Sequence, residues 1–117
     1  MADDANADAD TLLDHALDQM AAGQPANAIP LLRRACELAP DHPAASHALL
    51  RALEDSGQLS DALALVHSLI ALDPDDPLPH TRLSILLQKI GDVPGAEAAS
   101  ARARILEWKR QLRSSPA

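Results

Sequence analysis

A 34-residue periodicity is the sequence feature that most restricts what this chain can fold into. Three of the four glycines, Gly23, Gly57 and Gly91, are spaced 34 residues apart. The same interval relates further positions, namely Ala28, Ala62 and Ala96, then Leu38, Leu72 and Leu106, and then Pro40 with Pro74 and Pro43 with Pro77. A repeat of this length is typical of arrays that stack one small supersecondary unit on the next.

Each repeat carries the signals of two helices joined by a turn. Glycines end the first helices, because a residue without a Cβ adopts the left-handed conformation at least cost. Prolines break the chain between repeats. Apolar residues recur at spacings of three and four, as on one helix face. The pattern predicts first helices over residues 10–22, 44–56 and 78–90 and second helices over residues 26–38, 60–72 and 94–113. Helix caps are expected at Asp10, Ser60 and Asp92.

Composition favours helices and excludes several classes of function. Ala and Leu dominate the apolar residues, with one Trp and no Phe or Tyr. The net charge of -7 disfavours nucleic-acid binding, because phosphates repel an acidic surface. Cys36 is the only cysteine, so no intramolecular disulfide can form. The chain has neither a signal-peptide pattern nor an apolar run long enough to span a bilayer, which predicts a cytoplasmic protein without a membrane partner.

The repeat resembles the tetratricopeptide repeat family in its spacing. That family has a glycine between two helices, two alanines in the second helix and a proline that closes the unit. These places hold Gly23, Ala28, Ala35 and Pro40, then Gly57, Ala62, Leu69 and Pro74, then Gly91, Ala96, Ala103 and Trp108. The family's usual aromatic residues are replaced by other residues. The fold implied is all-α, a right-handed α-solenoid of three antiparallel helix pairs with an extended C-terminal helix. Its parts would be a disordered acidic N-terminus over residues 1–8, one domain over residues 9–113 with repeats 9–42, 43–76 and 77–110, and a disordered tail over residues 114–117.

The third repeat differs from the first two on one face. Glu97, Ser100 and Arg104 stand where the first two repeats have apolar residues or Cys36. A polar outer face is typical of a terminal repeat, so we expect the array to stop at three units in a complete small protein. The last helix then overshoots its repeat with Ile105, Trp108 and Leu112 on one stripe. This stripe either folds back to cap its own repeat or stays exposed for a partner or a second copy.

The resemblance implies a binding groove on the concave side, lined by the first helices. The residues that map there are Leu13, Leu17, Met20, His47, Arg51, Glu54, Thr81, Arg82, Ile85 and Lys89. Arginine can grip a carboxylate through two parallel hydrogen bonds, so a peptide or helix with an acidic residue would suit this patch. The alternative is that these are ordinary solvated side chains. A family subtype clamps chaperone tails with five polar residues. Here those places hold Leu13, Leu17, Ala48, Leu78 and Arg82, so that mechanism is not expected.

These observations predict a non-catalytic protein–protein interaction module, with no catalytic residues, no cofactor and no nucleic-acid partner. The alternative is a self-assembling structural subunit, joined through the C-terminal helix. An acidic head over residues 1–18 and a basic tail over residues 102–113 would favour head-to-tail contact, and both a monomer and a homo-oligomer remain open. A third possibility is a metal or small-ligand accessory. The spacing of Cys36, His42 and His47 matches no strong zinc pattern, so no metal site is expected, and Cys36 reads as a buried structural thiol.

Overall fold

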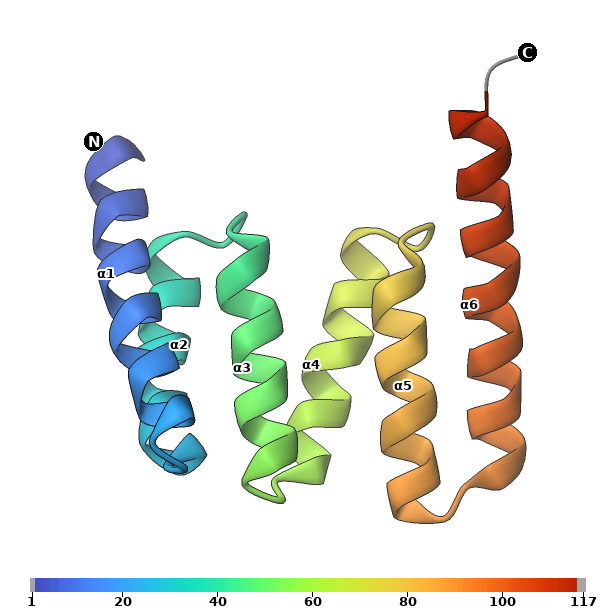
Figure 1. Ribbon diagram of the computed structural model, residues 1–117, viewed down its shortest axis with the longest axis horizontal. Helices are drawn as coiled ribbons and strands as arrows, with labels where there is room; N and C mark the ends of the chain where they lie inside the picture. The colour runs from blue at the N-terminus through green and yellow to red at the C-terminus, as the bar shows by residue number, and fades with distance from the viewer. Residues whose placement is uncertain (1, 116–117) are drawn as a thin grey trace. The chain divides into compact units, whose positions relative to one another are not determined.

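The computed structural model describes the backbone of residues 2–115 and the side chains of residues 7–115. Within this range, all of the regular secondary structure is helical, as the sequence predicts (Figure 1). The helices are α1 (Ala2–Ala21), α2 (Pro25–Leu38), α3 (Pro43–Asp55), α4 (Leu59–Leu72), α5 (Pro77–Ile90) and α6 (Val93–Ser114). None of these helices combines the length and apolar character that crossing a membrane requires.

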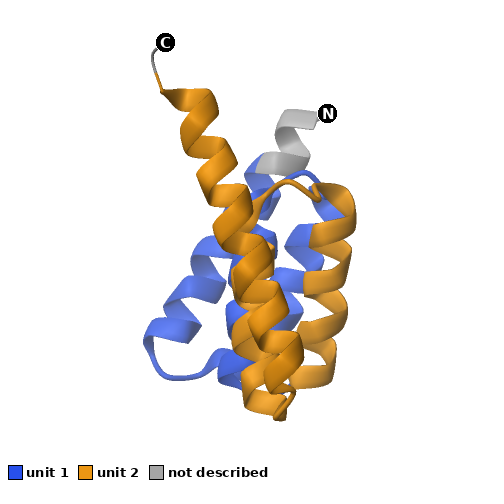
Figure 2. Ribbon diagram, turned by 90° about the vertical axis from the view of Figure 1, so that its right-hand side faces the viewer, with its two compact units in different colours: residues 1–58 blue, residues 59–117 orange. Residues whose placement is uncertain are grey.

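The helices form two compact units (Figure 2). Unit 1, Met1–Gln58, contains α1, α2 and α3, and α1 and α2 make the most extensive contact within it. Unit 2, Leu59–Ala117, contains α4, α5 and α6, with α5 packed on both of its neighbours. The division falls between the two helices of the second repeat, residues 43–76.

The turn between the two helices of each repeat is built as the sequence predicts. Gly23 and Gly57 have φ of +77° and Gly91 has φ of +99°, all in the left-handed region. They follow the ends of α1, α3 and α5 closely. The backbone N–H of Gly91 donates to the carbonyl oxygens of Leu87 and Gln88 and so satisfies the end of α5.

Five helices begin one residue before the predicted position, but the start of α1 differs from the sequence pattern. Helix α1 begins at Ala2, whereas the pattern predicts a start at residue 10 after a disordered stretch. The segment is rich in alanine, the strongest helix former, which explains how the helix extends backwards. Asp10 therefore lies inside α1, and Ser60 lies inside α4, so neither is a helix cap. Residue 1 and residues 116–117, in the two predicted disordered ends, fall outside the described residues.

The structure confirms the predicted cap of α6 and shows where Pro30 lies. Asp92 is the N-cap of α6, because its Oδ1 accepts a hydrogen bond from the backbone N–H of Gly95 at 3.0 Å. Pro30 lies within α2, which begins five residues earlier at Pro25. Its missing N–H removes one intrahelical hydrogen bond from the first part of that helix.

Small residues hold unit 1 together. A cluster of Ala9, Ala35, Ala39 and Ala45 joins α1, α2 and the start of α3, and Leu12 and Cys36 pack against it. Alanine side chains let helix axes approach closely, so the contact excludes water without large side chains. This cluster fixes the first turns of α3 against the pair formed by α1 and α2.

In unit 2, the contact between α5 and α6 combines apolar packing with one buried hydrogen bond. Leu86 and Leu106 are almost fully buried, and Ala96 is 1% exposed. The hydroxyl of Ser84 donates to the carbonyl oxygen of Ala96 at 2.8 Å. A buried hydroxyl without a partner would be costly, so this bond is what allows a polar residue at that place in the contact.

Candidate protein-interaction surface

In unit 1, the predicted groove residues lie on two helices that contact each other, α1 and α3. Leu17 on α1 is 43% exposed, which is high for a leucine. Leu13 and Met20 beside it are half-buried. On α3, Arg51 is exposed and His47 is half-buried. This part of the face thus presents apolar surface on one helix and a cation on the next.

In unit 2, the predicted residues lie on α5. Thr81 and Lys89 are exposed, while Arg82 and Ile85 are half-buried. The hydroxyl of Thr81 donates to the carbonyl oxygen of Pro77 at 3.3 Å, so its donor is satisfied within the helix. The residues of α5 and those of unit 1 belong to different units. The structure therefore brings together the residues within each unit, and one continuous groove stays a prediction.

Glu54 does not belong on an exposed binding face. The sequence places it beside Arg51 on α3, but its side chain is only 7% exposed. A buried carboxylate cannot offer its charge to an incoming ligand. The expectation for Glu54 is therefore wrong, because the helical spacing assigned it to the exposed face whereas it lies on the packed side of α3.

An open pocket of about 470 Å³ lies between α5 and α6. Its lining residues are Pro77, Thr81, Ser84 and Ile85 from α5 and Ser100, Ala103, Arg104 and Glu107 from α6. The guanidinium of Arg104 donates to the Ser100 hydroxyl at 3.1 Å. The pocket therefore combines apolar walls with one charge of each sign.

Two of the polar residues that distinguish the last repeat are exposed in the structure. Glu97 and Arg104 are exposed, whereas Ile29 and Leu32, which occupy the places of Glu97 and Ser100 in the first repeat, are buried. In unit 1, helix α3 packs on α1 and α2, and its first turn joins the alanine cluster with Cys36, the equivalent of Arg104.

The apolar stripe at the end of α6 is exposed. The exposed fractions of Ile105, Trp108 and Leu112 are 45%, 61% and 56%. Of the two arrangements that the sequence leaves open, the structure shows the one in which the stripe does not cap its own repeat. The side chains that do pack in unit 2, such as Ala103 and Leu106, lie on the other side of the helix.

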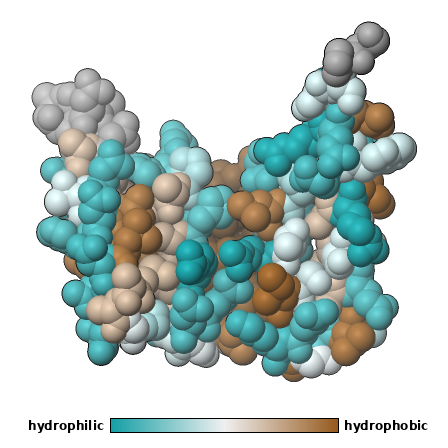
Figure 3. All heavy atoms as spheres, viewed as in Figure 1, coloured by the Kyte–Doolittle hydropathy of each residue, from teal (hydrophilic) through white to brown (hydrophobic). Residues whose placement is uncertain are grey.

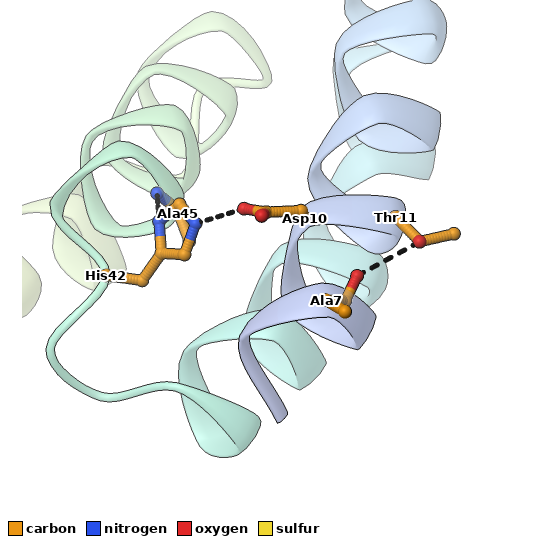
Figure 4. A network of polar contacts seen from close by, with 5 residues as sticks. All are labelled: Ala7, Asp10, Thr11, His42 and Ala45. Atoms are coloured by element: carbon orange, nitrogen blue, oxygen red, sulfur yellow. Dashed lines mark hydrogen bonds and ion pairs between the residues drawn. The ribbon is translucent and has the colours of Figure 1, made fainter. Parts of the chain in front are cut away.

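A contact that the sequence pattern did not reveal joins α1 to the start of α3 (Figure 4). His42 is the N-cap of α3, and its Nδ1 accepts a hydrogen bond from the backbone N–H of Ala45 at 3.3 Å. Its Nε2 lies 2.5 Å from Oδ1 of Asp10. The Nε2–H tautomer satisfies both contacts. The repeat does carry a signal, because Asp76 caps α5 at the equivalent position.

Two of the three residues considered for a metal site, Cys36 and His42, have other contacts. The Cys36 sulfur lies 3.9 Å from the Ser46 hydroxyl, beside the alanine cluster. Burial raises the pKa of the Cys36 thiol, and the hydrogen bond with Ser46 offsets part of that rise. His42 is held by Asp10 and Ala45. Among the described residues, no three His, Cys, Asp or Glu side chains gather in an arrangement that could hold a metal ion.

Comparison with solved structures finds the same fold in helical proteins of low sequence identity. PcrH, solved in complex with the chaperone binding region of PopB, has a TM-score of 0.75 at 21% identity, over 84% of this chain and 79% of PcrH. SycD, a type III secretion translocator chaperone of Yersinia enterocolitica solved as an alternative dimer, has a TM-score of 0.76 at 19% identity, over 90% of this chain and 83% of SycD. MamA MSR-1 has a TM-score of 0.78 at 19% identity, over 87% of this chain but 59% of MamA.

Sequence comparison identifies the family directly. A search of curated proteins finds no match. The family model for the tetratricopeptide repeat matches residues 19–83, which are 65 of the 117 residues and extend from the end of α1 into α5. The matched segment includes two of the three left-handed glycines, and the solved structures of similar fold agree in their helical architecture. The chain therefore belongs to the tetratricopeptide repeat family.

Proposed function

We propose that this protein is a non-catalytic interaction module that binds a peptide or helix of another protein. The residues proposed to bind are those predicted on α1 and α3 in unit 1 and, as a separate surface, those predicted on α5 in unit 2. The observation that carries the proposal is the exposure of Arg51. Its neighbours in the chain, Leu50 and Ala52, are almost fully buried, so α3 is anchored on one side and presents a cation on the other.

The chemistry of the face suggests the kind of ligand. In unit 1, Leu17 offers exposed apolar surface and Arg51 is an exposed cation, and in unit 2 α5 offers the exposed cation Lys89. Apolar contact supplies affinity, and a guanidinium can fix a carboxylate through paired hydrogen bonds. The preferred ligand is therefore an extended or helical segment with at least one apolar and one acidic side chain.

The solved structures of similar fold support binding as the use of this architecture. PcrH was solved with a segment of PopB, a protein partner. A preformed face needs no covalent chemistry to hold such a segment, because burial and ion pairing suffice. The present chain would bind a segment of its own partner in the same general way, by burial and ion pairing.

Affinity capture from the native cell tests the proposal. The baits are the wild type, the variant Arg51→Glu plus Lys89→Glu, and the control Arg33→Glu plus Arg34→Glu on α2. All four side chains are exposed, so the fold should survive, which circular dichroism checks. The expected result is a partner recovered by the wild type and the control but lost by the α3/α5 variant. Equal recovery by all three baits would show that the face assignment is wrong.

A further inference from the structure

Helix α6 has two apolar faces, and unit 2 uses only one of them. The packed face consists of Ala96, Ala99, Ala103 and Leu106, all buried. A second set consists of Ala98, Ala101, Ile105, Trp108 and Leu112. Successive residues of a helix are rotated by about 100°, which places the centre of the second set nearly opposite that of the first. Figure 3 shows apolar surface along α6, toward its C-terminal end.

The second set, which we call the outer seam, has the spacing of a coiled-coil interface. Its members, residues 98, 101, 105, 108 and 112, alternate in steps of three and four. In heptad terms they occupy successive a and d positions, and they span about 21 Å of helix. An apolar seam with this period is suited to another helix, whose side chains would enter the gaps between Ile105, Trp108 and Leu112.

The flanks of the outer seam are mostly basic. Arg102 and Lys109 border it at e positions, and Arg104 borders it at a g position. All three side chains are exposed. Glu97, the acidic residue at a g position, lies at the N-terminal end of the seam, away from Trp108 and Leu112. Flanking charges of this kind select the partner helix in coiled coils, and these select against a basic one.

Neither α6 nor α1 of a second copy suits the outer seam. Pairing two α6 helices would bring Arg104 and Lys109 of one copy against the same basic flanks of the other. The acidic helix α1 has suitable charge, but the face that it exposes consists mainly of polar residues such as Asp10, Asp14 and Asp18. A polar face cannot fill an apolar seam, so charge disfavours α6 and polarity disfavours α1 as the partner helix.

We propose that the outer seam of α6 binds an amphipathic helix of another protein, with apolar residues at heptad spacing and Asp or Glu along its flanks. This surface is separate from the face proposed on the first helices, and neither proposal depends on the other. Trp108 would be the central anchor, because large aromatic side chains contribute most when they are desolvated at the middle of an interface.

A designed peptide tests the outer seam without knowledge of the natural partner. The probe is a helix of about three heptads with Leu at a and d and Glu at e and g, and its counterpart has Lys at e and g. Neither peptide contains Trp, so emission comes from Trp108, the only tryptophan. The Glu peptide should shift this emission to the blue in a saturable way. The Lys peptide should bind at least about tenfold more weakly.

Variants of the full chain locate the contact. Ile105→Ala plus Leu112→Ala keeps the tryptophan and should weaken binding of the Glu peptide at least about tenfold. Leu72→Ala is the matched control, because Leu72 is 77% exposed on α4, and it should leave binding unchanged. Arg104→Glu plus Lys109→Glu should reverse the preference in favour of the Lys peptide. The Arg51→Glu plus Lys89→Glu variant should bind the Glu peptide as the wild type does.

Three outcomes would overturn the proposal. The first is an unshifted Trp108 spectrum with the Glu peptide, and the second is equal binding of the two peptides. The third is self-association of the protein alone that buries Trp108, seen as a concentration-dependent blue shift together with a dimer in analytical ultracentrifugation. That result would assign the outer seam to a second copy.

Discussion

His42 lies with its Nε2 2.5 Å from Oδ1 of Asp10, and this contact connects residues 32 positions apart in the sequence. It joins the middle of α1 to the first residue before α3. Because the Nδ1 of the same ring accepts the backbone N–H of Ala45, one imidazole both caps α3 and connects it to α1. The carboxylate favours the tautomer that leaves Nδ1 free to accept.

Substitution of His42 should therefore cost more than substitution of Asp10. His42→Ala removes the cap and the contact with α1 together, and should lower the free energy of unfolding by about 1–2 kcal/mol. Asp10→Ala removes only a largely exposed contact and should cost about 0.5–1 kcal/mol. Urea denaturation followed by circular dichroism measures both values, with Asp14→Ala as the control. Equal losses for His42→Ala and Asp14→Ala would refute the assigned role of the ring.

The Cys36 thiol should react slowly in the folded protein. Burial raises its pKa, so less thiolate is present at a given pH, and the thiolate is the reactive form. Modification by a disulfide reagent at mildly alkaline pH should be at least about tenfold slower in the native chain than in urea. A native rate equal to the unfolded rate would mean that the thiol is freely accessible.

The same shift makes stability depend on pH in a defined direction. Burial raises the pKa of the Cys36 thiol in the folded chain above its pKa in the unfolded chain, so the unfolded chain ionises this thiol more readily. The contribution of Cys36 to stability is therefore fully present below the unfolded pKa and is lost as the pH rises through the folded pKa. Comparison of the wild type with Cys36→Ala between neutral and alkaline pH isolates this effect. The difference in free energy of unfolding between the two proteins should change only in the alkaline range.

Gly57 should resist replacement because of its backbone alone. Its φ is +77°, and a Cβ added there would meet no atom within 4 Å. Gly57→Ala should therefore cost about 1–2 kcal/mol through the left-handed conformation, without any steric clash. Gly57→Asn should cost less, since asparagine tolerates this region better. If thermal denaturation ranks asparagine as the worse of the two, the turn must have been rebuilt.

Truncation of a side chain should cost much more stability on the packed face of α6 than on the outer seam. Leu106 is 2% exposed, so Leu106→Ala leaves a cavity and should cost about 2–5 kcal/mol. Leu112 is 56% exposed, and Leu112→Ala should change stability by less than about 0.5 kcal/mol. Chemical denaturation of the two variants side by side checks this. A large loss for Leu112→Ala would mean that the outer seam is already covered within the chain.

Local features of this fold were predictable from sequence, and contacts between distant residues were not. The glycines and the Asp92 cap act within a few residues of themselves, so their chemistry is readable from spacing. The start of α1 was not predicted, because the alanine-rich segment extends the helix toward the N-terminus, beyond the first amphipathic turn. The contact of His42 with Asp10 depends on how three helices pack, which no local pattern encodes.

The candidate sites show the same limit. Spacing places Ile105, Trp108 and Leu112 on one stripe, but it cannot say which of two apolar stripes on α6 faces the body of the unit. Spacing also assigned Glu54 to the exposed residues, although adjacent positions on α3 can differ between a buried and a solvated side chain. The remaining residues assigned to the first-helix face stay a prediction until a partner is found.

The contacts within each unit also bear on how quickly the chain reaches its native state. The main helix contacts join neighbours along the chain, such as α1 with α2 and α5 with α6, and the alanine cluster of unit 1 needs only α1, α2 and the start of α3. Each such pairing closes a short loop and therefore sacrifices little chain entropy before the contact forms. Proteins with contacts this local refold on the order of microseconds to milliseconds. Apolar surface would thus be exposed only briefly while the chain is synthesised.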